Sequence, residues 1–204
     1  IALKKNLKLI ENEEYISIDT EFIRDNTYFS KLCLIQVASK NHSFIIDPLK
    51  EDVKLDSLRK ILNKDTIIKI FHSGRQDMEI FYHLFGELPK PIYDTQIAAM
   101  VCGFGDQVSY ENLVNTLLNI RIDKSSRVSN WSFRPLTEKQ IKYALSDVTH
   151  LIHIYEKLKN QISNGNRSLW IEDEMKSLAE IKNYKINPSE AWMKIKIKST
   201  KREY

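Results

Sequence analysis

The sequence has few cysteines, few glycines and prolines, and no long apolar run. Its 204 residues include two Cys, five Gly and five Pro. Cys33 and Cys102 have no Cys or His partner at zinc-site spacing. This argues against a disulfide framework or a cysteine-rich zinc site and favours a reducing, cytoplasmic compartment. So little Gly and Pro excludes collagen-like and low-complexity chains. No apolar stretch reaches 18 residues, so we expect no transmembrane helix and no membrane partner.

The N-terminal segment also lacks the features expected at the beginning of a protein. It reads Ile1-Ala2-Leu3-Lys4-Lys5, without Met and without the apolar core of a signal peptide. We interpret it as an amphipathic helix entered part-way, and we expect that further residues precede it.

The first half of the chain predicts an α/β fold. Residues 15–22 alternate between apolar and polar side chains, as a half-buried strand does. With residues 31–38 and 43–47 they predict three strands on short connections, and hence an antiparallel meander. Predicted helices and strands then alternate, which adds parallel strands to the same sheet. The helices cover residues 55–62, 76–85 and 95–101, and the strands cover residues 67–71 and 92–93.

The second half of the chain is predicted to be helical. Ser109 is placed to cap a helix that runs through Leu118. Residues 137–140 (TEKQ) form a capping box that opens a long helix to about Ile162. An amphipathic helix over residues 168–182 and a basic stretch follow. We therefore divide the chain into a main domain, residues 1–162, and a helical extension with a basic tail, residues 163–204.

Four acidic residues are the informative feature of the sequence. Asp19 and Glu21 are two apart on a strand, so both side chains leave the same face with Cα atoms about 6.6 Å apart. Asp77 lies on the apolar stripe of its helix, and Asp147 lies on the inward side of the long helix. Each alone could be a solvated or ion-paired carboxylate. Together they predict a cation site, because unpaired buried carboxylates are costly.

Carboxylate oxygens favour Mg²⁺ or Mn²⁺. Two such ions about 3.5–4 Å apart can clamp a phosphodiester during in-line displacement. Tyr143, one helical turn before Asp147, is placed to hydrogen-bond the attacking water. The chain carries 31 Lys and Arg against 27 Asp and Glu. If ions neutralise four carboxylates, the remainder is more basic, which favours a polyanionic partner.

Three ordered segments resemble the motifs of the DEDD exonuclease superfamily: residues 18–22 (IDTEF), 71–77 (FHSGRQD) and 143–147 (YALSD). The Tyr-x-x-x-Asp form of the third is typical of the DEDDy branch. Residues 31–36 (KLCLIQ) and 131–136 (WSFRPL) are similar to the bacterial ribonuclease D family within that branch.

The resemblance implies an RNase H-like fold, with a five-stranded mixed sheet flanked by helices and a C-terminal helical extension. It implies a metal-dependent 3′→5′ exoribonuclease that releases nucleoside 5′-monophosphates and matures tRNA 3′ ends. The implied partners are RNA, above all tRNA precursors, and two Mg²⁺ or Mn²⁺ ions; no protein partner is evident. The implied catalytic residues are the four metal-binding carboxylates and one tyrosine: Asp19, Glu21, Asp77, Asp147 and Tyr143.

Substrate contacts are predicted at several further residues. The resemblance suggests that Thr20 and Phe22 touch the terminal nucleotide, although strand alternation equally favours a core position for both. His72 lies where a strand gives way to a helix and suits a phosphate or sugar contact, or a hydrogen-bonded core position. The polar loop before the third motif could hold phosphates and stack a base, or be a solvated loop with one anchoring Trp. Its candidates are Lys124, Arg127, Trp131 and Arg134.

Other patterns in the sequence have simpler interpretations. Asp94 is interpreted as a helix cap, and His150 and His153 lack a third ligand for zinc. Ribonuclease D commonly carries helical HRDC domains after the exonuclease domain, and residues 187–192 (NPSEAW) resemble the approach to the first of them. Two alternatives stay open: a 3′→5′ DNA exonuclease, and a catalytically silent nucleic-acid-binding module on the same fold.

Overall fold

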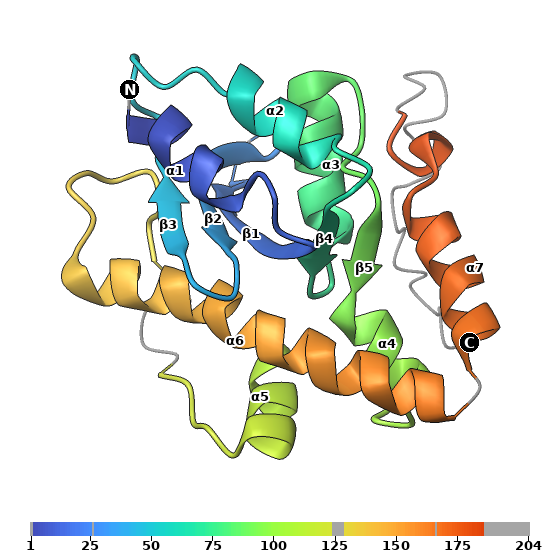
Figure 1. Ribbon diagram of the computed structural model, residues 1–204. Coiled ribbons are helices and arrows are strands. Elements are labelled where there is room, and N and C mark those ends of the chain that lie inside the picture. The colour runs from blue at the N-terminus through green and yellow to red at the C-terminus, as the bar shows by residue number, and fades with distance from the viewer. Residues whose placement is uncertain (1, 26, 124–128, 166, 186–204) are drawn as a thin grey trace, which may run out of the picture.

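One mixed five-stranded sheet organises the protein (Figure 1). The computed structural model describes residues 2–25, 27–123, 129–165 and 167–185. The strands are β1 (Tyr15–Ile23), β2 (Lys31–Ala38), β3 (Ser43–Ile46), β4 (Ile68–Phe71) and β5 (Ile92–Asp94), in the order β3-β2-β1-β4-β5. The β1–β2 and β2–β3 pairs are antiparallel, whereas the β1–β4 and β4–β5 pairs are parallel. The predicted meander with parallel additions is therefore confirmed.

Helices cover both faces of this sheet (Figure 1). Their bounds are α1 (Ala2–Ile10), α2 (Asp56–Leu62), α3 (Arg75–Phe85), α4 (Thr95–Val101), α5 (Tyr110–Leu118), α6 (Glu138–Asn164) and α7 (Ser168–Leu178). Helices α1, α2 and α3 lie on one face, and the long helix α6 crosses the other. Helices α4 and α5 pack against α6, and α7 packs against α4 and β5.

Side chains of β1 point alternately to the two faces of the sheet, towards α1, α2 and α3 or towards α6. Ile16 and Ile18 are fully buried in the apolar cluster with α1, α2 and α3. Ser17 points the other way, and its hydroxyl donates to the Val148 carbonyl of α6 at 2.8 Å. Because successive strand residues face opposite sides, Asp19 and Glu21 share the α6 side with Ser17.

Strand β1 extends beyond the end of its neighbour β4. The β1–β4 pairing ends at Ser17, while pairing with β2 continues to Ile23. The chain leaves β4 at Phe71 and enters α3 at Arg75. The first turn of α3 can therefore approach the part of β1 that carries Asp19 and Glu21, on the side that β4 no longer occupies.

Local signals set the start of α6. The Thr137 hydroxyl accepts from the Gln140 backbone N–H, and the Gln140 side chain accepts from the Thr137 backbone N–H, which is the predicted capping box. Ser109 caps α5 as predicted. The last predicted helix is shorter than expected, because α7 ends at Leu178 and only a 3₁₀ turn over Ile181–Asn183 follows.

Within the described residues, no helix is long and apolar enough to cross a membrane. The predicted basic tail and the HRDC-like residues 187–192 lie outside the described residues. The division of the chain at residue 162 stays a prediction.

Candidate active site

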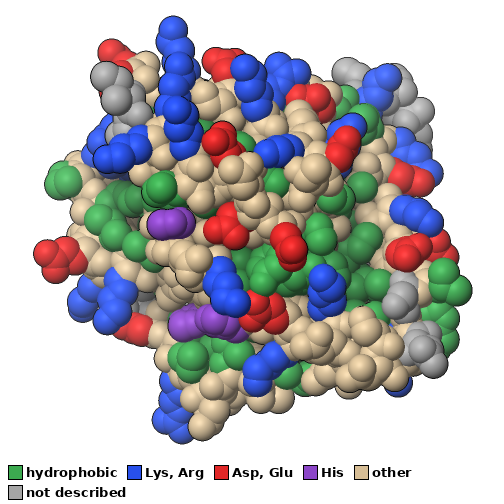
Figure 2. All heavy atoms as spheres, in the orientation of Figure 1, with side chains coloured by type: hydrophobic (Ala, Val, Ile, Leu, Met, Phe, Trp, Pro, Cys, Tyr) green, Lys and Arg blue, Asp and Glu red, His purple; other side chains and the backbone are tan. Residues whose placement is uncertain are grey.

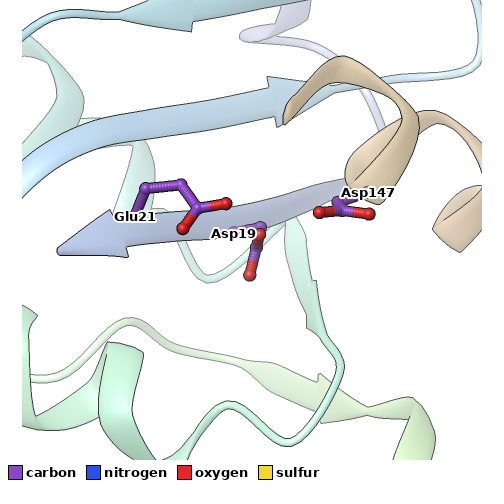
Figure 3. A group of neighbouring side chains, drawn as sticks. All are labelled: Asp19, Glu21 and Asp147. Carbon is purple, nitrogen blue, oxygen red and sulfur yellow. The ribbon is translucent and has the colours of Figure 1, made fainter. Parts of the chain in front are cut away.

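Three carboxylates converge between the sheet and α6 (Figure 3). Asp19 and Glu21 come from β1, and Asp147 comes from α6; one oxygen of each lies within 4.8 Å of the others. No other group of three or more such side chains forms among the described residues. The predicted shared strand face thus brings two carboxylates together, and the crossing of α6 adds a third.

This crowding makes the ionised carboxylates unfavourable in the absence of a cation. Burial, followed by the charges of Asp19 and Asp147, raises the pKa of Glu21 to about 9. Burial also raises the pKa of Asp19 to about 6, although the backbone N–H of Thr20 partly opposes this. A group with only oxygen donors and unrelieved repulsion fits a divalent cation of the Mg²⁺ or Mn²⁺ kind.

Asp77 lies beside this group and is not part of it. It is 6% exposed in the first turn of α3, and its Oδ1 accepts a hydrogen bond from the Thr20 hydroxyl at 2.5 Å. Burial and then the negative charge of Asp19 raise the pKa of Asp77. The fourth predicted carboxylate therefore comes from the helix layer opposite α6 and is still close enough to interact with Asp19.

Tyr143 and two of the carboxylates line one cavity of about 390 Å³. The pKa of Tyr143 is raised by burial, then by the charges of Asp147 and Glu21. The phenol therefore stays protonated at neutral pH, and its hydroxyl is a hydrogen-bond donor in the cavity. The remaining lining residues come from the β4–α3 turn, α4, α5, α6 and nearby loops: His72, Ser73, Gln96, Gln107, Ser109, Tyr110, Glu111, Ile122 and Leu151.

Two of the predicted substrate contacts are held by the protein itself. Trp131 is 2% exposed and packs on the Tyr143 ring at 6.1 Å between centroids, which leaves little of its ring open to a base. Arg134 forms two hydrogen bonds with the Asp47 carboxylate and donates to the Cys33 carbonyl. Its donors are taken by the protein, and it anchors the loop before α6 rather than presenting a free cation to phosphate.

The other predicted contacts have different outcomes. Thr20 is buried and bound to Asp77, which favours the interior position that strand alternation predicts. His72 lines the cavity, with Nδ1 2.9 Å from the Thr95 hydroxyl, and stays a candidate. Phe22 is partly exposed and also stays a prediction. Lys124 and Arg127 lie outside the described residues.

Sequence reasoning missed the second role of Asp94. Its carboxylate caps α4 as predicted, accepting from Gln96 N–H at 2.8 Å. It also accepts from the N–H groups of Ser73 at 3.1 Å and Gly74 at 2.7 Å, directly before α3. Ser73 has a φ of +57° there, and a Cβ on Gly74 would lie 2.6 Å from the Cβ of Phe71. One buried carboxylate thus holds the turn that places both the cavity wall and the helix of Asp77.

Replacing Glu21 by Gln is expected to stabilise the metal-free protein at alkaline pH. The folded-state pKa of Glu21 is raised, so this carboxyl contributes stability below about pH 4.5 that is lost as the pH rises towards 9. Gln resembles the protonated form and does not lose it. We expect the variant to gain about 1–3 kcal/mol over the wild type at pH 9 and almost nothing at pH 4.5, measured by urea unfolding in EDTA.

Glu174→Gln is the matched control, because Glu174 is exposed on α7. At pH 9 it should change the unfolding free energy far less than Glu21→Gln does. A Glu21→Gln effect that does not depend on pH would contradict the electrostatic account.

Comparisons with known proteins identify the family of the chain and agree with this fold. A family model described as 3′-5′ exonuclease matches residues 1–163. The chain therefore belongs to the 3′-5′ exonuclease family. A ribonuclease D from Bartonella henselae is 46% identical over 195 residues, covering 96% of this chain and 48% of that protein.

Two solved structures are also similar. The crystal structure of Escherichia coli RNase D, described as an exoribonuclease involved in structured RNA processing, has a TM-score of 0.89 and 34% identity over 95% of this chain and 51% of that one. Brucella melitensis NrnC with bound Mg²⁺ has a TM-score of 0.77 and 26% identity, over 92% of this chain and 90% of that one. The predicted RNase H-like fold is confirmed. The chain spans about half the length of the ribonuclease D relatives that it matches.

Proposed function

We propose that the chain is a 3′→5′ exoribonuclease of the ribonuclease D type, with two Mg²⁺ or Mn²⁺ ions as cofactors. The observation that supports this most directly is the convergence of Asp19, Glu21 and Asp147, with Tyr143 beside them in one cavity. The products are nucleoside 5′-monophosphates, and the substrates are RNA 3′ ends, including those of tRNA precursors. Action in the cytoplasm stays a prediction from the two free thiols.

The chain's own residues have separable roles in this reaction. Asp19, Glu21 and Asp147 would hold the ions, with Asp77 completing the set from α3. Bound divalent ions supply Lewis acidity, which activates water and stabilises charge on the leaving 3′ oxygen. The Tyr143 hydroxyl orients the attacking water, and the surrounding cavity walls restrict the terminal nucleotide to one place.

The distribution of charge on the surface adds little to this assignment. The face seen in Figure 2 carries Lys and Arg side chains spread among acidic ones, and the described side chains on it form no continuous basic patch. The substrate class therefore rests on the site and on the family rather than on a basic surface.

Digestion of 5′-labelled single-stranded RNA and DNA of the same sequence tests the proposal. With Mg²⁺ or Mn²⁺ the RNA should shorten stepwise from its 3′ end while the label stays on the longer fragments; EDTA should stop the reaction. Immediate release of a labelled mononucleotide would show instead that digestion starts at the 5′ end. Preferred digestion of DNA would support the DNA exonuclease, and binding without cleavage would support the silent module.

Adding Mn²⁺ or Mg²⁺ should raise the melting temperature of the protein. An ion that binds only the folded state stabilises it by about 2.7 kcal/mol at a hundred times its dissociation constant. The double variant Asp19→Asn/Glu21→Gln removes two of the three converging anions, so its ion-induced shift should be much smaller. Differential scanning fluorimetry over an ion titration measures both shifts.

The matched control is Glu51→Gln/Asp52→Asn, which removes two adjacent exposed carboxylates. It should keep the full ion-induced shift. If both double variants respond like the wild type, the ions bind elsewhere.

A further inference from the structure

Thr20 lies between Asp19 and Glu21 in the sequence, but its side chain is on the opposite side of β1. Thr20 is 6% exposed and points towards α3, because strand residues alternate between faces. Its Oγ1 lies 2.5 Å from Oδ1 of Asp77, which is also 6% exposed. A single strand therefore carries two converging carboxylates on one side and a hydroxyl bound to another acidic side chain on the other.

Apart from Thr20, the Asp77 carboxylate accepts from its own backbone N–H, which ties it only to its own helix. Its helix neighbours Met78, Ile80 and Phe81 are buried apolar side chains. A buried carboxylate without a donor is costly, and a short side chain on a helix can adopt more than one rotamer. The Thr20 hydroxyl supplies Oδ1 of Asp77 with a donor from a different element of the fold.

The donor itself is rigidly placed. Thr is β-branched, which restricts χ1, and its backbone is fixed by the pairing of Thr20 with Ile35 in β2. The hydrogen bond thus ties the Asp77 carboxylate to the strand that carries Asp19 and Glu21, rather than only to its own helix.

We propose that Thr20 is a positioning residue, whose hydroxyl holds Asp77 in the orientation in which it acts together with Asp19 on the divalent ions. This inference rests on the proposed function and goes beyond it, because it assigns Thr20 to the metal site through Asp77 and not to the nucleotide. It also gives a physical reason for a hydroxyl-bearing residue between the two carboxylates.

Two substitutions separate the hydroxyl from the shape of Thr20. Thr20→Val keeps the volume and β-branching and removes the donor, whereas Thr20→Ser keeps the donor. Ser17→Ala is the matched control, because it removes another buried hydroxyl of β1 whose acceptor is the Val148 carbonyl. Far-UV circular dichroism should show that all three variants fold.

The first measurement asks whether the two side chains are coupled without metal. Urea unfolding in EDTA is compared for Thr20→Val, for Asp77→Ala and for the double variant. Thr20→Val should destabilise the wild type, since it removes a hydrogen-bond donor from a buried carboxylate, and should cost little once Asp77 is absent. Additive effects would overturn the proposal.

The second measurement is the Mn²⁺ midpoint in a thermal-shift titration. Losing a hydrogen bond that orients a metal ligand typically costs 10–100-fold in affinity or activity, so Thr20→Val should raise the midpoint by about that factor. Thr20→Ser should restore it, and Ser17→Ala should not move it. An unchanged midpoint in Thr20→Val would also overturn the proposal.

The third measurement, RNA digestion, distinguishes the proposal from the proposed function. Thr20→Val should lower kcat about 10–100-fold with an unchanged KM, because the residue does not touch RNA. A raised KM with an unchanged kcat would instead place Thr20 against the nucleotide. If the wild type digests no RNA, the proposed function fails, while the unfolding and Mn²⁺ experiments still decide the role of Thr20.

Discussion

Asp19→Asn is expected to remove more than about 99% of the 3′→5′ activity while leaving the fold intact. Even residues that only orient a metal ligand contribute 10–100-fold, and Asp19 is proposed as a direct ligand. Its oxygen lies among those of Glu21 and Asp147, and its charge also acts on Asp77. No other described side chain is placed to supply that central anion. Initial rates on 5′-labelled RNA at saturating Mg²⁺ measure the loss.

Asp25→Asn provides the matched control, because Asp25 is exposed just beyond the same strand. It should digest RNA at the wild-type rate. The Asp19→Asn variant should unfold at the same or a higher urea concentration than the wild type in EDTA, since it relieves repulsion. Near-normal digestion by Asp19→Asn would rule out the proposed metal site.

The fold could be predicted from local patterns to a large extent. Alternation gives β1, and the caps at Ser109 and Thr137 give the starts of α5 and α6, because both signals are contained within a few residues. The length of the final helix could not be read the same way. Its amphipathic pattern continues to residue 182, but the α-helix ends at Leu178.

The site was predictable where the pattern is local. Asp19 and Glu21 share a strand face by spacing alone, and the inward stripe of α6 identifies Asp147. The same spacing places Thr20 on the opposite face, yet only the packing of α3 against β1 shows that its partner is Asp77. Packing of this kind joins residues 57 positions apart.

Two of the predicted substrate contacts could not be judged from the sequence for the same reason. Trp131 and Arg134 look like free ligands for RNA in a polar loop, because their partners lie outside that loop. Arg134 pairs with Asp47, 87 positions away, and Trp131 packs against Tyr143. A basic or aromatic residue in a loop therefore indicates an RNA-binding surface only when it has no contact partner elsewhere in the fold.

Tyr143→Phe is expected to lower kcat by about 10²–10⁴-fold and to leave RNA and ion binding near normal. The substitution keeps the ring, its packing on Trp131 and all four carboxylates. It removes only the hydroxyl, which burial and neighbouring negative charge keep protonated by raising its pKa. A loss confined to kcat would mark a contribution made in the transition state rather than in ground-state binding.

Tyr15→Phe is the appropriate control for this change. The Tyr143 hydroxyl is hydrogen-bonded to the Asp147 carboxylate. The Tyr15 hydroxyl likewise donates to a carboxylate, that of Glu156 at 2.6 Å, but it lies at the start of β1 and does not line the cavity. Losing that bond should cost about 1 kcal/mol of stability and leave kcat unchanged. The contrast separates a hydroxyl that orients water from one that only completes a hydrogen bond. If Tyr143→Phe digests RNA as fast as the wild type, Tyr143 is a packing residue, and the water must be oriented by another group of the cavity.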